Sequence, residues 1–329
     1  SISISTLYSQ QIIFPGLKGD SLLTEIKRYY KPSVTLDYDQ ARTMLYSKVF
    51  LRNDTLECFY SGHKVAIPRG TPILSWTARM GFQTDHLYPR SYGAASGAPL
   101  SDLHHLVPAL ATINTLRKNS PFVDIPDHKT RYWLLKDKVY QRPDPAIIDK
   151  YTESATGMIE PREIRKGDVA RSLFYFYSIY GSQAARKNRT YFSSMLPDLC
   201  RWNRLDRPDS LEYNRTLAIG RIQGNVNPFV IDPSLADRCY CLKYSDTPST
   251  QFKVNIYPNP SKGLFYIDIP GYAGPVVLKI SDQSGKLLET HHLVYSGLLS
   301  WRLGEGVWKL ELEMEMGGGI RRFEVIIQK

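Results

Sequence analysis

The sequence predicts an α+β protein, with a large and mostly helical first domain followed by a small all-β sandwich. In the first part of the chain, apolar residues recur at helical spacing, as in residues 20–30 and 166–180. Beyond residue 251, runs of alternating apolar and polar residues follow one another, and Gly, Pro or Ser-Gly interrupts them every ten to twelve residues. This second pattern is typical of short antiparallel strands.

The two patterns meet at a polar, proline-containing stretch, SDTPSTQ, that is typical of a linker. We therefore expect a first domain at residues 1–244, a linker at residues 245–252 and a β-sandwich at residues 253–329. A chain of 329 residues is long enough for two domains.

Within the first domain, periodicity and turn residues divide the chain into helices, strands and loops. The segments with helical spacing are 20–30, 37–50, 106–119, 166–180, 195–203 and 206–223. Short strand-like runs occupy 56–60, 64–67 and 73–76, a small-residue loop spans 93–99, and 123–165 reads as irregular. Pro108 is compatible with the first turn of the helix predicted at 106–119.

The charge of the chain lies in the first domain. The whole sequence has 42 Lys and Arg against 32 Asp and Glu, for a net charge of +10. From Gln251 onwards the counts are nine and eight, so the first 250 residues hold 33 basic and 24 acidic groups. A basic surface favours a polyanionic partner, although simple solubility explains it equally well. No run of eighteen apolar residues predicts a membrane span, and residues 1–11 do not resemble a signal peptide.

Four cysteines allow disulfides but do not define their pairing. Cys239 and Cys241 are too close in sequence to bridge each other easily, so each is expected to reach a distant partner, with Cys58 and Cys200 available. A four-thiolate zinc site is the alternative, but the paired C-x-x-C spacing is missing.

The stretch from Gly81 to Phe122 contains the candidate catalytic and metal-binding residues. Three of the seven histidines lie here, and Asp85 precedes His86 directly. An imidazole can accept a proton from water, and carboxylate and amide oxygens such as those of Asp85 and Asn114 can hold a hard divalent cation. Arginines near these residues, Arg90 and Arg117, can pair with a phosphate.

Other catalytic readings of the stretch lack their motifs. A zinc hydrolase could use His86, His104 and His105, but no H-E-x-x-H occurs. Ser91 could be part of a Ser-His-Asp triad, but no G-x-S-x-G occurs. His104 and His105 are therefore expected to be supporting or structural residues.

Four separated motifs resemble the bacterial endonuclease I family over roughly residues 20–240. They are DH-x-x-P-x-S, SDLHHLVPALATINTLRKN, GDVARSLFYFYSIYG and RWNRLDRPD…NRT…RIQGNVNPFV. The resemblance implies a ββα-metal (His-Me finger) core in a secreted or periplasmic nuclease. Such enzymes cut DNA, and often RNA, with little sequence preference.

The resemblance also implies roles for individual residues. His86 is the implied general base, and Asp85 and Asn114 are the implied ligands of one divalent cation, Mg²⁺, with Mn²⁺ or Ca²⁺ as substitutes. Asp85 stands where the family usually has Glu, which shortens this ligand by one methylene. Arg90 is the candidate for transition-state stabilisation. Arg117 and Asn119 match family positions and are expected to bind substrate.

The last part of the chain resembles the C-terminal sorting domain of type IX secretion in Bacteroidetes. The resemblance rests on YPNPSKGLFYIDI, ISDQSGKLL and the terminal EVIIQK. It implies a secretion-machinery partner and a secreted or cell-surface location, where a disulfide bond persists.

We therefore expect a monomeric secreted endonuclease whose substrate is DNA, with RNA as a second candidate substrate. Two alternatives stay open. One is a catalytically weak nuclease-like domain that binds polyanions or acts at the cell surface. The other is a hydrolase of a different phosphodiester.

Overall fold

The computed structural model describes residues 12–241, 254–269, 274–295, 298–314 and 319–328. Contacts within the chain divide it into two units, Ser1–Tyr244 and Ser245–Lys329. Each unit is considered by itself below. The expected linker, residues 245–252, lies outside the described residues, as do residues 1–11.

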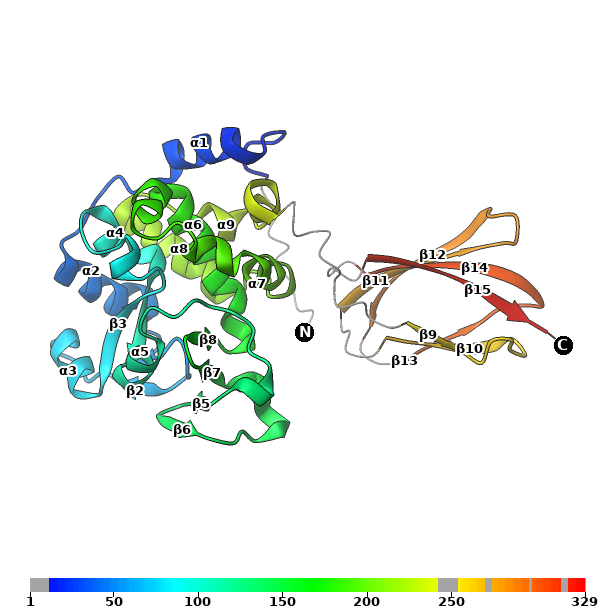
Figure 1. Ribbon diagram of the computed structural model, residues 1–329, viewed down its shortest axis with the longest axis horizontal. Helices are drawn as coiled ribbons and strands as arrows, with labels where there is room; N and C mark the ends of the chain where they lie inside the picture. Colours follow the sequence, from blue (N-terminus) through cyan, green and yellow to red (C-terminus); the bar gives the residue numbers. More distant parts are fainter. Residues whose placement is uncertain (1–11, 242–253, 270–273, 296–297, 315–318, 329) are drawn as a thin grey trace. The chain divides into compact units, whose positions relative to one another are not determined.

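Helices form most of the first unit (Figure 1). The longer ones are α1 (Gly19–Tyr30), α6 (Glu163–Lys187), α7 (Tyr191–Leu205) and α8 (Ser210–Gln223). Helix α2 (Tyr38–Met44) continues directly into a π-helical turn, η1 (Leu45–Phe50). The shorter ones are α3 (Ile73–Arg79), α4 (Ala98–Ser101), α5 (Ala111–Arg117), α9 (Pro228–Ile231) and α10 (Ser234–Ala236). The helices predicted at 20–30, 37–50, 166–180, 195–203 and 206–223 are thereby confirmed, with shifted ends.

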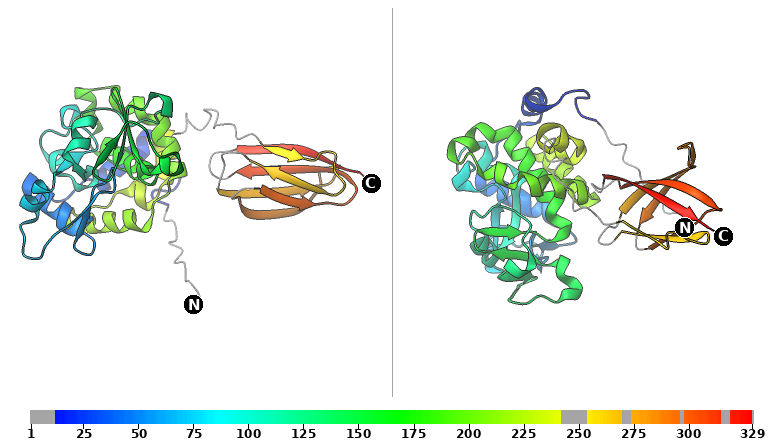
Figure 2. Two further views of the ribbon diagram at one scale, coloured as in Figure 1. Left: turned by 90° about the horizontal axis from the view of Figure 1, so that it is seen from below. Right: turned by 45° about the vertical axis from the view of Figure 1, so that its right-hand side comes forward.

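Helix α6 forms the centre of this unit, among α7, α8 and α9 (Figures 1 and 2). Most of its residues are buried on all sides, including a run of aromatic residues. Phe176 stacks on Tyr88 with 4.2 Å between ring centroids, and Tyr177 stacks on Phe192 at 4.0 Å. Phe174, Tyr175 and Phe176 are fully buried, although the helix also buries charged residues nearer its start. The aromatic residues of α6 therefore build the core.

Small antiparallel sheets, three in the described part of the chain, complete the first unit. Strand β1 (Thr55–Glu57) pairs with β2 (Lys64–Ala66), and β3 (Phe82–His86) pairs with β4 (Leu106–Leu110). The third sheet has the order β6-β5-β7-β8. Its strands are β5 (Tyr132–Leu135), β6 (Lys138–Tyr140), β7 (Thr152–Ala155) and β8 (Met158–Glu160).

The helix predicted at 106–119 is wrong in its first half. Residues Leu106–Leu110 form strand β4, and the helix begins only at Ala111. Pro108 is tolerated because β4 pairs on one side only, with Thr84 opposite, and its carbonyl accepts from Phe59 N at 2.8 Å. A short apolar run fits a strand as well as a helix, and here pairing with β3 decides. The result is a two-stranded ribbon followed by a helix.

Two further predictions in this unit are wrong. Residues 73–76, predicted as a strand, begin helix α3, whose N-cap is Pro72. The Trp76 indole donates to Ala66 O at 3.0 Å and so fixes this helix on β2. Residues 123–165, predicted as irregular, contain the sheet of β5 to β8. Strands of three or four residues are too short for periodicity to reveal them.

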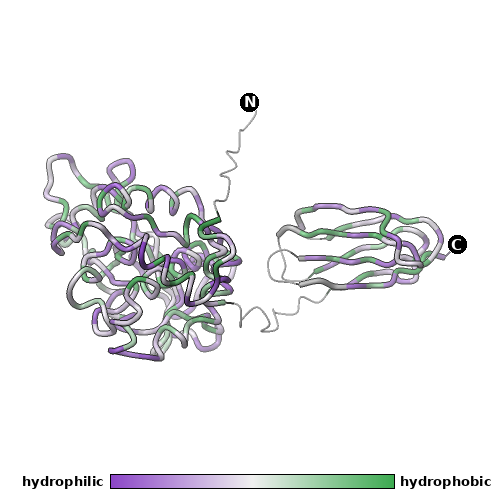
Figure 3. Tube along the Cα trace, turned by 90° about the horizontal axis from the view of Figure 1, so that it is seen from above, coloured by the Kyte–Doolittle hydropathy of each residue, from purple (hydrophilic) through white to green (hydrophobic). Residues whose placement is uncertain are grey.

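The described residues of the second unit form two antiparallel sheets, which Figure 1 shows as separate layers. One has the order β13-β10-β9 and the other β12-β11-β14-β15. Their bounds are β9 (Asn255–Tyr257), β10 (Leu264–Asp268), β11 (Gly274–Ser281), β12 (Leu287–Tyr295), β13 (Leu298–Arg302), β14 (Gly306–Met314) and β15 (Gly319–Ile327). Hydropathy alternates along these strands (Figure 3), and the buried positions of both sheets face one core that includes Phe265, Leu278 and Val325.

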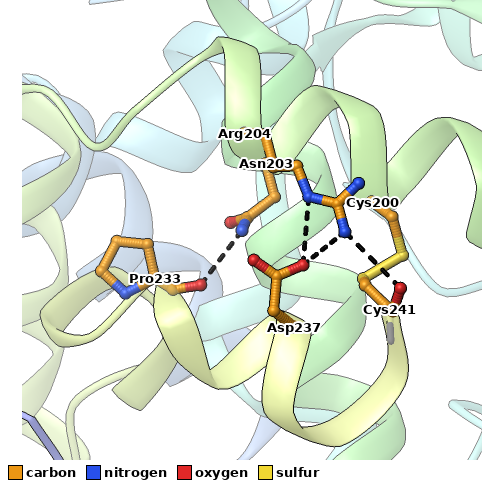
Figure 4. The surroundings of a disulfide bond; sticks show 6 residues. All are labelled: Cys200, Asn203, Arg204, Pro233, Asp237 and Cys241. Carbon is orange, nitrogen blue, oxygen red and sulfur yellow. Dashed lines mark hydrogen bonds and ion pairs between the residues drawn. A yellow bond between two sulfur atoms is a disulfide. The ribbon is translucent and has the colours of Figure 1, made fainter. Parts of the chain in front are cut away.

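A disulfide bond closes the end of the first unit. Cys200 of α7 is joined to Cys241 of the last helical turn, η6 (Asp237–Cys241). Beside it, Arg204 pairs with Asp237 (Figure 4). The expectation that Cys241 reaches a distant partner is confirmed. For Cys239 it is wrong, because Cys239 and Cys58 are free thiols.

Among the described residues, no helix is long and apolar enough to cross a membrane.

Candidate active site

The ribbon of β3 and β4 and the following helix α5 bring the candidate residues to one cleft. The cleft has a volume of about 380 Å³. Its walls come from α2, β3, the 3-10 turn η2 (Arg90–Tyr92) and the end of α5. Its lining residues are Tyr38, Arg42, Gln83, Thr84, Asp85, His86, Pro89, Arg90, Asn114, Lys118 and Asn119. Five of the six predicted site residues are among them, and the exception is Arg117.

His86 is held at the end of β3 in one defined state. Its Nε2 atom lies 2.9 Å from the carbonyl oxygen of Leu100 in α4. A carbonyl can only accept, so Nε2 carries the proton and Nδ1 is left as the basic nitrogen. The ring also stacks on Tyr38. Burial lowers the pKa of His86 to about 4, so the imidazole is neutral at pH 7.

The two other histidines of the stretch, His104 and His105, are bonded to backbone carbonyls away from the cleft. The Nε2 atom of His105 donates to the Pro99 carbonyl at 2.7 Å, and its Nδ1 is buried without a partner among the described residues. His104 bonds through Nε2 to the carbonyl of Asn225 at 3.0 Å. Burial lowers the pKa of both rings, that of His105 to about 3. Neither lines the cleft, as expected for structural residues.

Asp85 takes part in a buried cluster with Arg117 and Tyr60. Arg117 Nη1 donates to both carboxylate oxygens, at 2.8 and 2.7 Å, and Tyr60 donates to Oδ2 at 2.6 Å. The same guanidinium donates to the carbonyls of His86 and Leu87, both at 2.6 Å. Burial opposes the charge of Arg117, but attraction to Asp85 outweighs it and raises the pKa of Arg117.

Arg117 is therefore placed behind the cleft wall. Its side chain is 1% exposed, and the predicted substrate-binding role would need it to reach the cleft. Its hydrogen bonds to Asp85, His86 and Leu87 instead tie the end of β3 and the start of the following loop to the end of α5. The geometry gives this arginine the means to fix the position of Asp85 and of the backbone at His86.

Asn114 faces the cleft from α5 with its amide already oriented. Its Nδ2 donates to Gln83 Oε1 at 2.9 Å, so the oxygen Oδ1 is available as an acceptor, and no described residue bonds to it. Alternation along β3 puts Gln83 on the same side of the strand as Asp85. That spacing could have identified Gln83 from the sequence, but the sequence reasoning missed it.

Positive charge predominates at the cleft. Arg42, Arg90 and Lys118 line it, whereas the charge of its one carboxylate, Asp85, is matched by Arg117. The guanidinium groups of Arg42 and Arg90 lie over the Tyr38 ring, 5.7 and 5.9 Å from its centroid. Such a cleft favours an anionic ligand. Tyr38 and Arg42 lie far from the other site residues in sequence, and no sequence signal connected them to the site.

Comparisons with known proteins agree with this arrangement. A family model described as "Endonuclease I" matches residues 22–234, which is more than half of the chain. A second model, "Secretion system C-terminal sorting domain", matches residues 255–299. The chain therefore belongs to the endonuclease I family and carries a C-terminal sorting domain.

Similar curated proteins are named as nucleases. The chain is 28% identical over 169 residues to an "Extracellular ribonuclease" of Bacillus amyloliquefaciens, which covers 47% of this chain and 53% of that protein. It is 30% identical over 132 residues to a "Periplasmic deoxyribonuclease" of Aeromonas hydrophila, covering 39% and 46%. It is 26% identical over 132 residues to an "Endonuclease-1" of Buchnera aphidicola, covering 40% and 46%. The chain thus spans about half the length of these relatives.

The sorting domain and the extracellular and periplasmic relatives support a secreted or cell-surface protein.

Proposed function

We propose that the chain is a metal-dependent endonuclease that hydrolyses phosphodiester bonds of DNA, and of RNA, with little sequence specificity. The relatives named as deoxyribonuclease and ribonuclease support both substrates. We further propose that residues 1–244 are the nuclease domain, and that β3, β4 and α5 form its ββα-metal (His-Me finger) core. Residues 253–329 are then the sorting domain, joined to it by a linker.

The observation that carries the proposal is the anchoring of His86. The bond from Nε2–H to Leu100 O fixes both the tautomer and the ring orientation. His86 can therefore accept, through Nδ1, the proton of the water that attacks phosphorus. The same bond stabilises the imidazolium that forms, because a carbonyl oxygen attracts the positive ring. Arg90 and Asn119, both exposed at the cleft, can donate to the phosphate oxygens.

The residues at the cleft also suit a divalent cation. The cation would not be held by a cluster of acidic residues, histidines or cysteines, because the described residues contain no group of three or more of them that could hold a metal ion. Mg²⁺ prefers oxygen ligands and retains several waters, so a carboxylate and an amide oxygen suffice. Asp85 has about four lone-pair positions. Arg117 and Tyr60 use three of them, and one remains on Oδ1.

Asp85 and Asn114 would hold this cation, Mg²⁺ in the first place and Mn²⁺ or Ca²⁺ as substitutes. The bound ion would stabilise the charge that develops on the phosphate and neutralise the leaving oxygen. Arg117 then acts as a positioning residue, because it holds Asp85 from behind.

A plasmid-degradation assay tests the proposal. With Mg²⁺, the wild type is expected to cut, and EDTA is expected to stop it. His86→Ala should lower the rate by a factor on the order of 10² to 10⁴, the usual contribution of a general base. His128→Ala is the matched control, since His128 is exposed and does not line the cleft. Cleavage that survives both EDTA and His86→Ala would overturn the proposal.

One observation favours a second candidate, a catalytically weak nuclease-like domain that binds polyanions. The Asp85 charge is already matched by Arg117, which weakens its attraction for a cation. Asp85→Glu distinguishes the two candidates, because it restores the longer side chain usual in the family. A large rise from near-zero activity would favour the second candidate, whereas wild-type activity that is already high would favour the first.

A further inference from the structure

A second pocket of the first unit, separate from the cleft, has four cations and one carboxylate as its charged lining residues. It has a volume of about 280 Å³. Arg52 and Lys64 lie at its exposed rim, and Arg165 and Arg215 are buried in its wall, against Glu57 as its one carboxylate. We call it the basic pocket, defined by these five residues. It shares no lining residue with the cleft.

The closest carboxylate partners of the buried arginines lie on the other side of the wall, although Arg165 also lies 3.7 Å from Glu57 of the pocket. Asp168 accepts from Arg165 at 3.0 Å and also pairs with Arg215. Asp168 and Glu212 line a smaller inner cavity of about 40 Å³ and not the basic pocket. The basic pocket therefore presents four cationic side chains and one carboxylate.

Arg52 has no acidic partner of its own. Its guanidinium donates to the carbonyl of its neighbour Leu51 at 2.8 Å, and it forms no ion pair with any described residue. Partial burial, and then the nearby charge of Arg215, lowers the pKa of Arg52. Lys64 is only loosely paired, 3.5 Å from Glu57. An incoming anion would relieve this crowding of like charges.

The continuous helical segment formed by α2 and η1 contributes residues to both the cleft and the basic pocket. Tyr38 and Arg42, at its start in α2, line the cleft, whereas Val49 and Phe50, at its end in η1, line the pocket. The rise from Arg42 to Phe50 is roughly 12 Å at 1.5 Å per residue. Successive phosphates of one duplex strand are about 3.4 Å apart along the axis. A strand that runs along this helix would span that rise with a few nucleotides.

We propose that the basic pocket binds a second phosphate group of the nucleic acid substrate, a few nucleotides from the bond that is cut. The inference rests on the proposed function, because it assumes a polynucleotide substrate. Arg52 makes the main contact, since a guanidinium matches a phosphate in a bidentate way. Lys64 adds a second positive charge. The pocket adds affinity and length dependence, without sequence readout.

The test compares Arg52→Gln and Arg52→Gln/Lys64→Gln with wild type and with Arg186→Gln. Arg186 is the matched control, since it is exposed and lines neither site. Binding of a fluorescein-labelled 20-bp duplex is followed by anisotropy in EDTA, from about 50 to 200 mM salt, so that no cleavage is needed. Cleavage of a bis-aryl phosphate, too short to reach the pocket, is measured with Mg²⁺.

The expected result is weaker duplex binding, by about five- to tenfold at 50 mM salt for Arg52→Gln, and a salt slope that is smaller by about one. The double variant should lose more, and bis-aryl phosphate cleavage should be unchanged. If wild type cleaves and both variants bind the duplex like Arg186→Gln, the inference is overturned and the proposed function stands. If wild type neither binds nor cleaves nucleic acid, the proposed function fails and the inference with it.

Discussion

The pairing of Arg117 with Asp85 gives the sharpest prediction about the architecture of the site. Arg117→Met removes the guanidinium but keeps an unbranched apolar side chain of similar length. It leaves the Asp85 carboxylate, in a residue that is only 5% exposed, with Tyr60 as its one remaining partner among the described residues. Removal of one partner from a buried ion pair typically costs about 3–5 kcal/mol. The carbonyls of His86 and Leu87 also lose their donor.

A double-mutant cycle measures this coupling. Asp85→Asn alone leaves Arg117 buried beside a neutral amide, and the double variant Asp85→Asn/Arg117→Met removes both charges. The free energy of unfolding is measured by urea titration, with hydrogen exchange of peptides that cover β3 and α5 as the local readout. We expect a coupling free energy of about 2 kcal/mol or more. Two single variants that each cost less than about 1 kcal/mol, with additive effects, would refute the reasoning.

Three further predictions concern stability and the proposed metal site. Burial lowers the pKa of His105 from its ordinary value of about 6.5 to about 3 in the folded state. Below about pH 6.5 the unfolded chain therefore binds a proton at His105 that the folded chain does not, and stability is lost as the pH falls. Between pH 7 and 5, the unfolding free energy of the wild type should fall by about 2 kcal/mol more than that of His105→Gln, measured by paired urea titrations. An equal pH dependence of both proteins would contradict this. Because the Cys200–Cys241 bond closes a loop with a sequence separation of 41, Cys200→Ala/Cys241→Ala should lower the unfolding free energy by about 2–4 kcal/mol, and unchanged urea midpoints would argue against a role of the bond in stability. Asn114→Ala should weaken Mn²⁺ binding, measured by calorimetry, by about tenfold or more, whereas an unchanged affinity would exclude Asn114 as a ligand.

The sequence was a good guide to the long helices, and it identified five of the eleven residues that line the cleft. The long helices α1 and α7 were predictable because their apolar positions repeat over several turns. Asp85, His86, Arg90, Asn114 and Asn119 all line one cleft, as expected for residues of one site. Their predicted roles stay predictions.

Tertiary contacts determined what the sequence pattern could not. The run at 106–110 satisfies a strand and a helix equally, and only its pairing with β3 selects the strand. Likewise, nothing near Arg117 in sequence shows that Asp85 lies against it, because the contact joins α5 to β3. Tyr60 completes the cluster from another part of the chain. From its residue type and motif, Arg117 was expected to bind substrate. In the fold it is buried and pairs with the carboxylate of Asp85.

We propose that Asp85 and Asn114 hold one cation beside His86 and that His86 presents Nδ1 to the reacting water. A crystal structure of the protein soaked in Mn²⁺, with anomalous data to locate the ion, tests it most directly. We expect one ion with Asp85 and Asn114 Oδ1 as its protein ligands, and the His86 ring still bonded through Nε2 to Leu100 O. An ion bound elsewhere, or a His86 ring released from Leu100 and itself bound to the ion, would contradict it.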